Sequence, residues 1–167
     1  MNEADRLELA IPALRRYARV LTRDSVAADD LVQDCLVRAL PKLATVRDGN
    51  DLRPWLFTIL RNLHISRWRR LKRTLAVSLK YPETGVQPAA QEARSDLYDV
   101  LRILFQLPEE QREIMMMVAV EDMEYGVIAE VLGIPIGTVM SRLSRGRAAL
   151  RANFDGKASR PVLRRVK

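Results

Sequence analysis

The chain has 167 residues, enough for one domain or two small ones. With 48% hydrophobic and 29% charged residues, it can form a packed core, which excludes a wholly disordered protein. Its 28 Lys and Arg against 21 Asp and Glu give a net charge of +7, which favours an anionic partner.

Cysteine and histidine are too rare for several classes of site. The single cysteine, Cys35, excludes an intramolecular disulfide, suits a reducing compartment and is predicted to be a small buried residue. The single histidine, His64, has no neighbours at metal-ligand spacing. We find no nucleophile–base pair, paired carboxylates or glycine-rich phosphate loop, so we expect no enzyme activity, metal or cofactor.

The N-terminal residues MNEADRLELA carry acids and no long apolar run. This predicts neither a signal peptide nor a membrane-spanning helix. We therefore expect a cytoplasmic protein that does not insert into membranes.

The first part of the chain predicts two helices in succession. Apolar residues recur at helical spacing from Leu7 to Leu21, and Pro12 inside this run predicts a kink or a restart of the helix. Ser25 is the expected N-cap of a second helix, whose apolar face continues to Leu43.

A loop is predicted over residues 48–54, and a third helix then continues to about Arg70. Periodicity fades after this helix, where prolines and a glycine indicate a flexible linker. We predict an all-α protein of four parts: a helical domain over residues 1–73, a linker over 74–94, a second helical domain over 95–152 and a basic tail over 153–167.

The second domain carries the pattern of a helix-turn-helix. After a helix capped by Ser95, Pro108 is expected at the first position of the next one, whose three methionines, Met115–Met117, are predicted to fill the core. Gly133 marks a tight turn before a helix over Gly137–Arg151. The outer face of that helix, with small polar residues and arginines, suits the DNA major groove. The alternative is a helical hairpin with a solvated basic face.

Basic and aromatic residues alternate in the third helix. The segment from Arg61 to Arg73 is rich in arginine and contains no acid, and Trp55, Phe57 and Trp68 lie within it or nearby. Arginines neutralise phosphates and aromatic rings stack on unpaired bases, so single-stranded or melting DNA is the expected ligand. A solvated helix end and buried aromatic rings are the alternative.

The second helix presents an acidic stripe. Asp30, Gln33, Asp34 and Val37 fall at i, i+3, i+4 and i+7, opposite much of the apolar face. Acids on a basic protein repel DNA, so the stripe indicates either a protein partner with a basic surface or a plain solvated face.

Three motifs in this order resemble conserved regions two and four of the sigma-70 family. They are AADDLVQDCLVRAL (residues 27–40), RPWLFTILRNLHISRWRR (53–70) and LPEEQREIMMMVAVEDMEYGVIAEVLGIPIGTVMSRLSRGRAALR (107–151). More narrowly, the chain resembles the extracytoplasmic-function (ECF) class, which keeps only these two domains. The resemblance implies a sigma factor that binds core RNA polymerase, recognises promoters, promotes DNA melting, serves stress-response genes and is controlled by an anti-sigma factor.

The resemblance also assigns residues to partners. Binding of core polymerase falls to Asp30, Leu31, Gln33 and Asp34, because the first domain of the family docks on a coiled coil of the beta-prime subunit. The beta subunit is a further expected partner. Recognition of the minus-ten element falls to the loop over residues 46–53 and to Arg53, Trp55, Arg61, Asn62, Ser66, Arg69 and Arg70. Recognition of the minus-thirty-five element falls to Thr138, Ser141, Arg142, Ser144, Arg145 and Arg147.

Two features depart from this family's pattern. Met140 stands where relatives often carry Lys or Arg, so we expect an altered DNA contact and an unusual promoter preference. The basic tail either binds DNA loosely or is a solvated end. Two other functions stay open: a sigma-like decoy that sequesters an anti-sigma factor, and an autonomous helix-turn-helix regulator that acts without polymerase.

Overall fold

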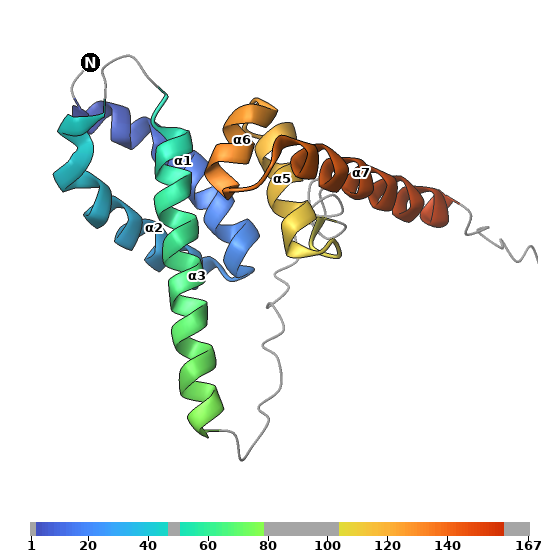
Figure 1. Cartoon of the computed structure of the whole chain (residues 1–167), viewed down its shortest axis with the longest axis horizontal. Helices are drawn as coiled ribbons and strands as arrows, with labels where there is room; N and C mark the ends of the chain where they lie inside the picture. The colour runs from blue at the N-terminus through green and yellow to red at the C-terminus, as the bar shows by residue number, and fades with distance from the viewer. Residues whose placement is uncertain (1–2, 47–50, 79–103, 159–167) are drawn as a thin grey trace, which may run out of the picture.

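The computed structural model describes residues 3–46, 51–78 and 104–158, and regular structure in these ranges is helical, which confirms the predicted fold class (Figure 1). In chain order the elements are α1 (Glu3–Thr22), α2 (Ser25–Ala39), the short 3-10 helix η1 (Leu40–Thr45), α3 (Arg53–Ser78), α5 (Glu109–Ala119), α6 (Tyr125–Leu132) and α7 (Ile136–Ala158). Most of the predicted linker, the helix capped by Ser95 and the end of the basic tail lie outside the described residues.

Helix α1 runs through Pro12 as one helix, which excludes the restart of the two predicted alternatives, a kink or a restart. Proline in a helix interior costs about 3 kcal/mol because it removes a backbone donor and crowds the preceding turn. Pro12 itself is exposed, whereas Ala10, Ala13 and Leu14 beside it are buried against the neighbouring helices. Tertiary packing of these residues holds the helix together across the proline.

The N-cap of helix α2 lies one residue before the predicted cap, and the helix ends earlier than expected. Asp24, not Ser25, is the N-cap: its side chain accepts a hydrogen bond from the amide of Ala27 at 2.7 Å. Both residue types cap well, and the extended backbone at Asp24 decides between them. The residues predicted to end this helix instead form the separate 3-10 helix η1, which has Pro41 in its first turn. Leu43 in η1 is still buried.

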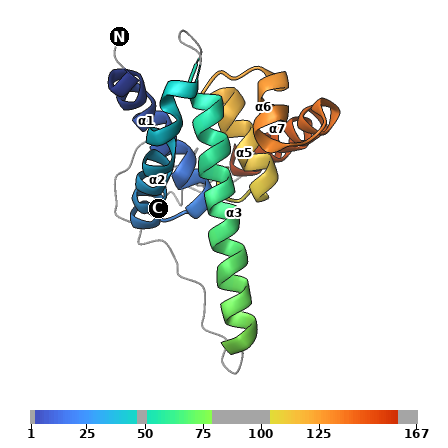
Figure 2. The same cartoon turned by 60° about the vertical axis from the view of Figure 1, so that its left-hand side comes forward.

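Helix α3 is longer than predicted. Its start is capped by Asp51, which accepts from the Arg53 amide at 2.9 Å, and it continues to Ser78, past the predicted end at Arg70 and the predicted start of the linker. Figure 2 shows α3 between α1–α2 and α5–α7, with its second half projecting beyond both. The apolar period stops where α3 leaves the core, but residues of high helix propensity continue the helix beyond that point.

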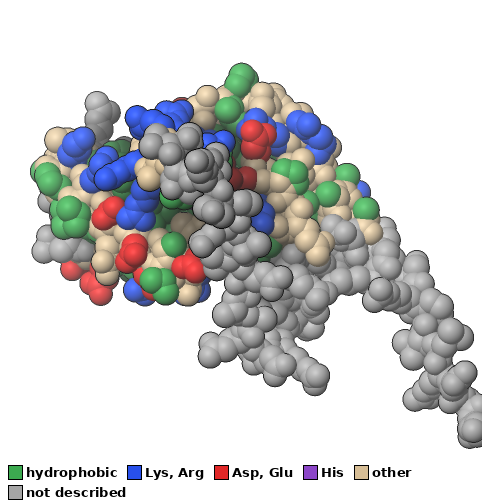
Figure 3. Space-filling model, turned by 90° about the horizontal axis from the view of Figure 1, so that it is seen from below, with side chains coloured by type: hydrophobic (Ala, Val, Ile, Leu, Met, Phe, Trp, Pro, Cys, Tyr) green, Lys and Arg blue, Asp and Glu red, His purple; other side chains and the backbone are tan. Residues whose placement is uncertain are grey.

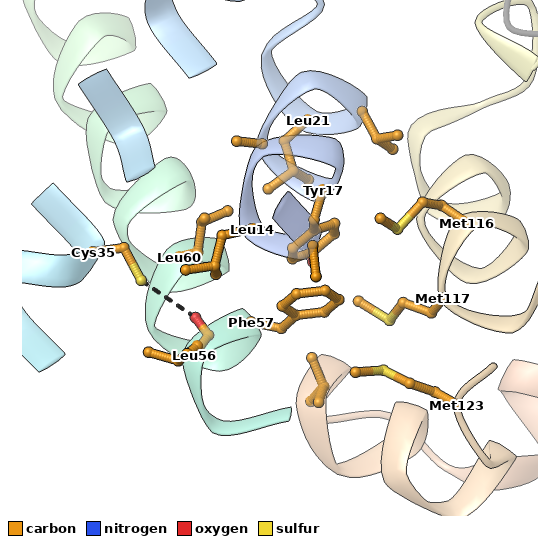
Figure 4. Packing of buried hydrophobic residues seen from close by; sticks show 14 of the residues in the cluster. Leu14, Tyr17, Leu21, Cys35, Leu56, Phe57, Leu60, Met116, Met117 and Met123 are labelled. Atoms are coloured by element: carbon orange, nitrogen blue, oxygen red, sulfur yellow. Dashed lines mark hydrogen bonds between the residues drawn. The ribbon is translucent and has the colours of Figure 1, made fainter. Parts of the chain in front are cut away.

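The helices form two regions that share one core. Helices α1, α2 and α3 pack together as the first region, and α5, α6 and α7 form the second; α5 also packs against α1, and α6 against α3. Figure 4 shows Met116 and Met117 of α5 and Met123 beside the stacked rings of Tyr17 and Phe57, whose centroids are 4.6 Å apart. The predicted core role of the methionine run is confirmed.

Cys35 is a buried residue of the first region, as predicted. Its thiol donates to the carbonyl oxygen of Leu56 at 3.5 Å, and burial raises the pKa of Cys35 to about 12. A thiol with so high a pKa is a poor nucleophile, so Cys35 contributes to packing of the core.

Within the described ranges, no single helix is long and apolar enough to cross a membrane. Helix α6 and the part of α7 up to Ala152 pass that test only as a pair, bent by 104° at the break between them.

Candidate nucleic-acid interface

Helices α6 and α7 form the predicted helix-turn-helix. Gly133 ends α6 in the left-handed conformation (φ 65°), which glycine adopts without strain, and the Ile134 amide donates to the Ala129 carbonyl at 3.0 Å. Helix α7 starts three residues after Gly133, and the two helices meet at 104°. This angle lies within the range of about 90–120° that is typical of the motif.

One face of α7 is fixed to the rest of its region. Val139 and Leu143 are buried, and Gly146 lies so close to α5 that an added Cβ would be 3.1 Å from Cγ of Met115. This packing directs the opposite face outward. Four residues predicted for the minus-thirty-five element are exposed, three of them on that opposite face and Arg147 on its flank, and we refer to them as the reading face: Ser141, Ser144, Arg145 and Arg147.

The other two residues predicted for this element lie at the edge of α7. Thr138 is half-buried, and Arg142 is an ion-pair partner of α5, because its Nη2 lies 2.8 Å from Oε2 of Glu110. Only 20% of the Arg142 side chain is exposed. The structure therefore holds Arg142 against its own region and leaves the other arginines pointing outward.

Six of the seven residues predicted for the minus-ten element fall into two groups, and Trp55 belongs to neither. The first is exposed along α3 and comprises Asn62, Ser66, Arg69 and Arg70. Figure 3 shows Lys and Arg side chains gathered on the face seen from below, with a separate group of Asp and Glu side chains beside them. Trp55 is partly buried and packs against the core, as its alternative interpretation stated.

The second group contacts the other region. Arg53 donates from Nη1 to the Glu121 carbonyl oxygen at 3.0 Å, and the Nε of Arg61 lies 3.4 Å from Oε1 of Glu113. Arg16 of α1 also donates to the Glu121 carboxylate, at 2.7 Å. Glu113 and Glu121 are only 4% and 2% exposed, so two candidate promoter arginines neutralise carboxylates buried between the regions.

Glu113 is joined to both long helices of the first region. Besides the Arg61 contact, it accepts a hydrogen bond from the Tyr17 hydroxyl at 3.1 Å. Burial raises the pKa of Glu113, against the opposing effect of the nearby Arg61 guanidinium. Burial also raises the pKa of Tyr17, and the Glu113 charge adds to this. The hydroxyl therefore stays protonated and available as a donor.

Arg112 connects the two regions from the inside. It is 1% exposed, and it donates from Nε to the Val20 carbonyl at 2.9 Å and from Nη1 to the Leu107 carbonyl at 3.1 Å. Val20 lies in the last turn of α1, where carbonyl groups lack partners within the helix and where a cation is favoured. Burial lowers the pKa of Arg112 from its ordinary value.

Sequence patterns did not identify these contacts between regions. An available signal was the acid-rich stretch LPEEQRE, in which Glu109 and Glu113 fall one helical turn apart in an otherwise basic protein. A second signal was Arg112 beside the apolar run that follows it. Neither reveals which distant helix supplies the partner.

His64 has a carboxylate neighbour rather than a metal environment. Its Nε2 lies 3.5 Å from Oε1 of Glu109, and the hydrogen bond with His64 lowers the pKa of Glu109. In the part of the chain that the structure describes, no group of His, Cys, Asp or Glu side chains could hold a metal ion.

The acidic stripe of α2 is a surface, with one correction. Asp30, Gln33 and Asp34 are exposed, and we keep the name acidic stripe for these three residues. Leu31 is fully buried in the core because it faces the opposite side of α2, so its assignment to a partner surface is wrong. Arg67 of α3 pairs with Asp34, which links the stripe to the basic helix.

Comparison with known proteins gives matches over both regions. Residues 7–61 match the family described as the sigma2 domain of PhyR, and residues 97–150 match sigma-70 region 4. The chain is 36% identical to the ECF RNA polymerase sigma factor EcfG of Rhodopseudomonas palustris (strain TIE-1), over 89% of this chain and 82% of the relative. It is 33% identical to the ECF sigma factor SigM of Mycobacterium tuberculosis, over 82% and 69%.

Solved structures give the same result. The sigma factor RpoE, solved in complex with the anti-sigma factor NepR from Bartonella quintana, has a TM-score of 0.74 and 34% identity, and the match covers 91% of this chain and 96% of that one. The PhyRSL–NepR complex from Sphingomonas sp. Fr1 shares the fold, with a TM-score of 0.68 at 17% identity. The chain therefore belongs to the ECF class of the sigma-70 family, with a sigma2 region and a region 4, and is a sigma factor rather than an enzyme.

Proposed function

We propose that the chain binds core RNA polymerase, recognises the minus-ten and minus-thirty-five elements and promotes opening of promoter DNA. The observation that carries this proposal is that one chain presents three separate surfaces of suitable chemistry. These are the acidic stripe on α2, the exposed basic half of α3 and the reading face of α7. An autonomous regulator would need only the last of them.

The first region supplies the chemistry for opening DNA. Helix α3 contains no acidic residue, and Arg69 and Arg70 are exposed on its projecting half, where they can neutralise phosphates. Asn62 and Ser66, exposed on the same helix, can donate hydrogen bonds to an unpaired base. Binding a base outside the stack offsets the cost of unstacking it, so melting needs no nucleotide hydrolysis.

Two of the residues proposed to bind the minus-ten element become available only when the two regions separate. Arg53 and Arg61 reach promoter DNA only after leaving Glu121 and Glu113. In our proposal, binding of core polymerase, through its beta-prime and beta subunits, drives this separation. A ligand shifts such an equilibrium only by its preference for one state, so polymerase must bind the open form more tightly.

The division of the chain follows from this proposal, with adjusted limits. We assign a sigma2 domain that extends to Ser78 rather than residue 73, because α3 continues that far. Helix α7 extends to Ala158, beyond the predicted end of the helix at Arg151, so we extend the region 4 domain from residue 152 to Ala158. The segment between the two domains is the proposed linker.

An anti-sigma factor is the proposed regulatory partner. The similarity to RpoE, which was solved with NepR, supports a partner of the NepR kind. We further propose a cytoplasmic location and control of stress-response genes, both of which rest on the family relationship.

Transcription with purified components tests the function. The full chain is mixed with core RNA polymerase and a library of promoters, and specific initiation is the expected result. Core binding without initiation would favour the sigma-like decoy instead. Promoter binding that needs no core enzyme would favour the autonomous regulator.

A charge reversal tests the acidic stripe separately. Asp34→Arg is expected to weaken core binding by at least about tenfold, since like charges then meet across the interface. The matched control is Glu8→Arg, because Glu8 is exposed on α1 and carries the same charge. Equal core affinities of the two variants would remove the stripe from the polymerase surface.

A further inference from the structure

Two large apolar side chains are exposed at the start of the helix that the proposed function places in the major groove. Ile136 is 51% exposed and Met140 is 54% exposed, and they lie one turn apart on α7. In the described part of the second region, Val120 at the end of α5 is the other large apolar side chain with more than half of its surface exposed. An exposed apolar pair within a binding face is informative, whereas a single exposed residue is not.

The neighbours of Met140 leave its side chain prominent. Gly137, Ser141 and Ser144 are small and exposed on the same side of α7, and a Cβ added at Gly137 would meet no atom within 4 Å. Small residues let the helix backbone approach the floor of a groove. The long thioether of Met140 then reaches further than any of these three neighbours.

An open hollow of about 350 Å³ borders Met140. The side chains that share its wall are Tyr125, Leu143, Ser144, Ala148, Arg147 and Arg151. The flexible methionine can therefore change rotamer without meeting packed atoms. The two arginines give this side of α7 the charge needed to lie near phosphates, which favours DNA over an apolar protein surface as the occupant.

Groove chemistry limits what a methionine can recognise. Base edges in the major groove present hydrogen-bond donors and acceptors, and the C5-methyl group of thymine is their distinctive apolar feature. A methionine at position 140 has no N–H or O–H with which to satisfy an acceptor. We propose that Met140, supported by Ile136, is a specificity-determining residue that contacts a thymine methyl group in the minus-thirty-five element. This inference rests on the proposed DNA-reading role of α7.

Replacement of thymine by uracil tests the contact because it removes only the methyl group. The probe is a promoter selected by the holoenzyme, with each thymine of its minus-thirty-five element replaced in turn by uracil. One position is expected to bind about fourfold more weakly with uracil, as for loss of one buried methyl-sized group. Met140→Ala is expected to bind the thymine and uracil probes equally, whereas Met140→Leu keeps the difference.

Val120→Ala is the matched control, because it removes an equally exposed apolar side chain outside α7. This control is expected to keep the full thymine–uracil difference. The inference is overturned if no uracil substitution weakens binding, if Met140→Ala keeps the dependence, or if the selected element contains no thymine. Failure of the wild-type holoenzyme to select any promoter is a different result, which overturns the proposed function as well.

Discussion

Two pairs of arginines predicted to contact DNA, one pair in each region, lie in opposite environments. In the first region, Arg53 and Arg61 point into the interface and neutralise Glu121 and Glu113. In the second region, Arg145 and Arg147 are exposed on the reading face. The same residue type therefore joins the two regions in one place and is exposed in the other, where we propose that it contacts DNA.

Burial of the partner explains this difference. A carboxylate removed from water is strongly destabilising unless a cation and hydrogen bonds compensate it. Glu113 and Glu121 are almost fully buried, so they require the first region's arginines. Glu110, which pairs with Arg142, is 65% exposed and imposes no such requirement. We expect the contact between the two regions to depend on the buried pairs, whereas the Arg142–Glu110 pair lies within the second region and does not join them.

The largest effect is expected from reversing the charge at Glu121. Glu121→Arg places a third cation beside Arg16 and Arg53, and we expect it to weaken the contact between the regions by about 3 kcal/mol. That is about a 100-fold shift towards separated regions. The distance between fluorophores on cysteines introduced at the exposed residues Lys42 and Ala152 measures the separation.

Glu130→Arg is the control for this experiment, because Glu130 is exposed on α6 and the charge change is the same. The control is expected to keep the wild-type distance. If both variants give the same distance distribution, the buried pairs do not hold the regions together.

Arg112→Ala is expected to lower the free energy of unfolding by about 3 kcal/mol. The change leaves the carbonyl groups of Val20 and Leu107 buried without these donors, and it creates a cavity. Arg38→Ala, at an exposed position in α2, is expected to cost less than about 1 kcal/mol. Urea titrations followed by circular dichroism compare the two, and equal losses would contradict a special role of Arg112.

Arg145→Ala sharpens the comparison within α7. If this exposed arginine reads a base, its loss weakens minus-thirty-five binding by about 1–3 kcal/mol and relaxes the preference at one position. Arg142→Ala is expected to have a smaller effect, since Glu110 already holds that arginine against α5. Holoenzyme binding to a set of single-base promoter variants measures both. An unchanged preference in Arg145→Ala would remove Arg145 from the reading face.

The smallest effect is a pH dependence of stability. Burial raises the pKa of Glu113, so the folded state binds its proton more tightly than the unfolded state. Stability from this group therefore increases as the pH falls from neutral towards the ordinary pKa of 4.5, and it decreases as the pH rises through the raised pKa. Each unit of the shift corresponds to about 1.4 kcal/mol.

Glu113→Gln isolates this dependence because it removes the titration and keeps the shape. Unfolding free energies of the variant and the wild type are compared between about pH 4.5 and 8. Below this window, Glu109 acts in the opposite direction, since its pKa is lowered and its stabilising charge is lost on protonation. The same slope in variant and wild type would show that Glu113 is not the group responsible.

Local patterns determined most of the secondary structure and one of the binding faces. The helical period located α2, α3 and α7, and Gly133 marked the turn correctly because its left-handed conformation is a local property. The outward direction of Ser144 and Arg145 follows from the 3.6-residue period alone, once Val139 and Leu143 are known to be apolar. The end of α3 was missed because it continues beyond the core that produces the period.

Tertiary structure decided which charges are free. Neither the pairing of Arg61 with Glu113 nor the burial of Arg112 follows from spacing along the chain, since each depends on α5 docking against helices many residues away. Leu31 shows the same limit on a single helix, because it is adjacent in sequence to the exposed Asp30 yet lies on the buried face. Residue type determined the chemistry of the binding surfaces, and long-range packing determined which of those side chains remain available to a partner.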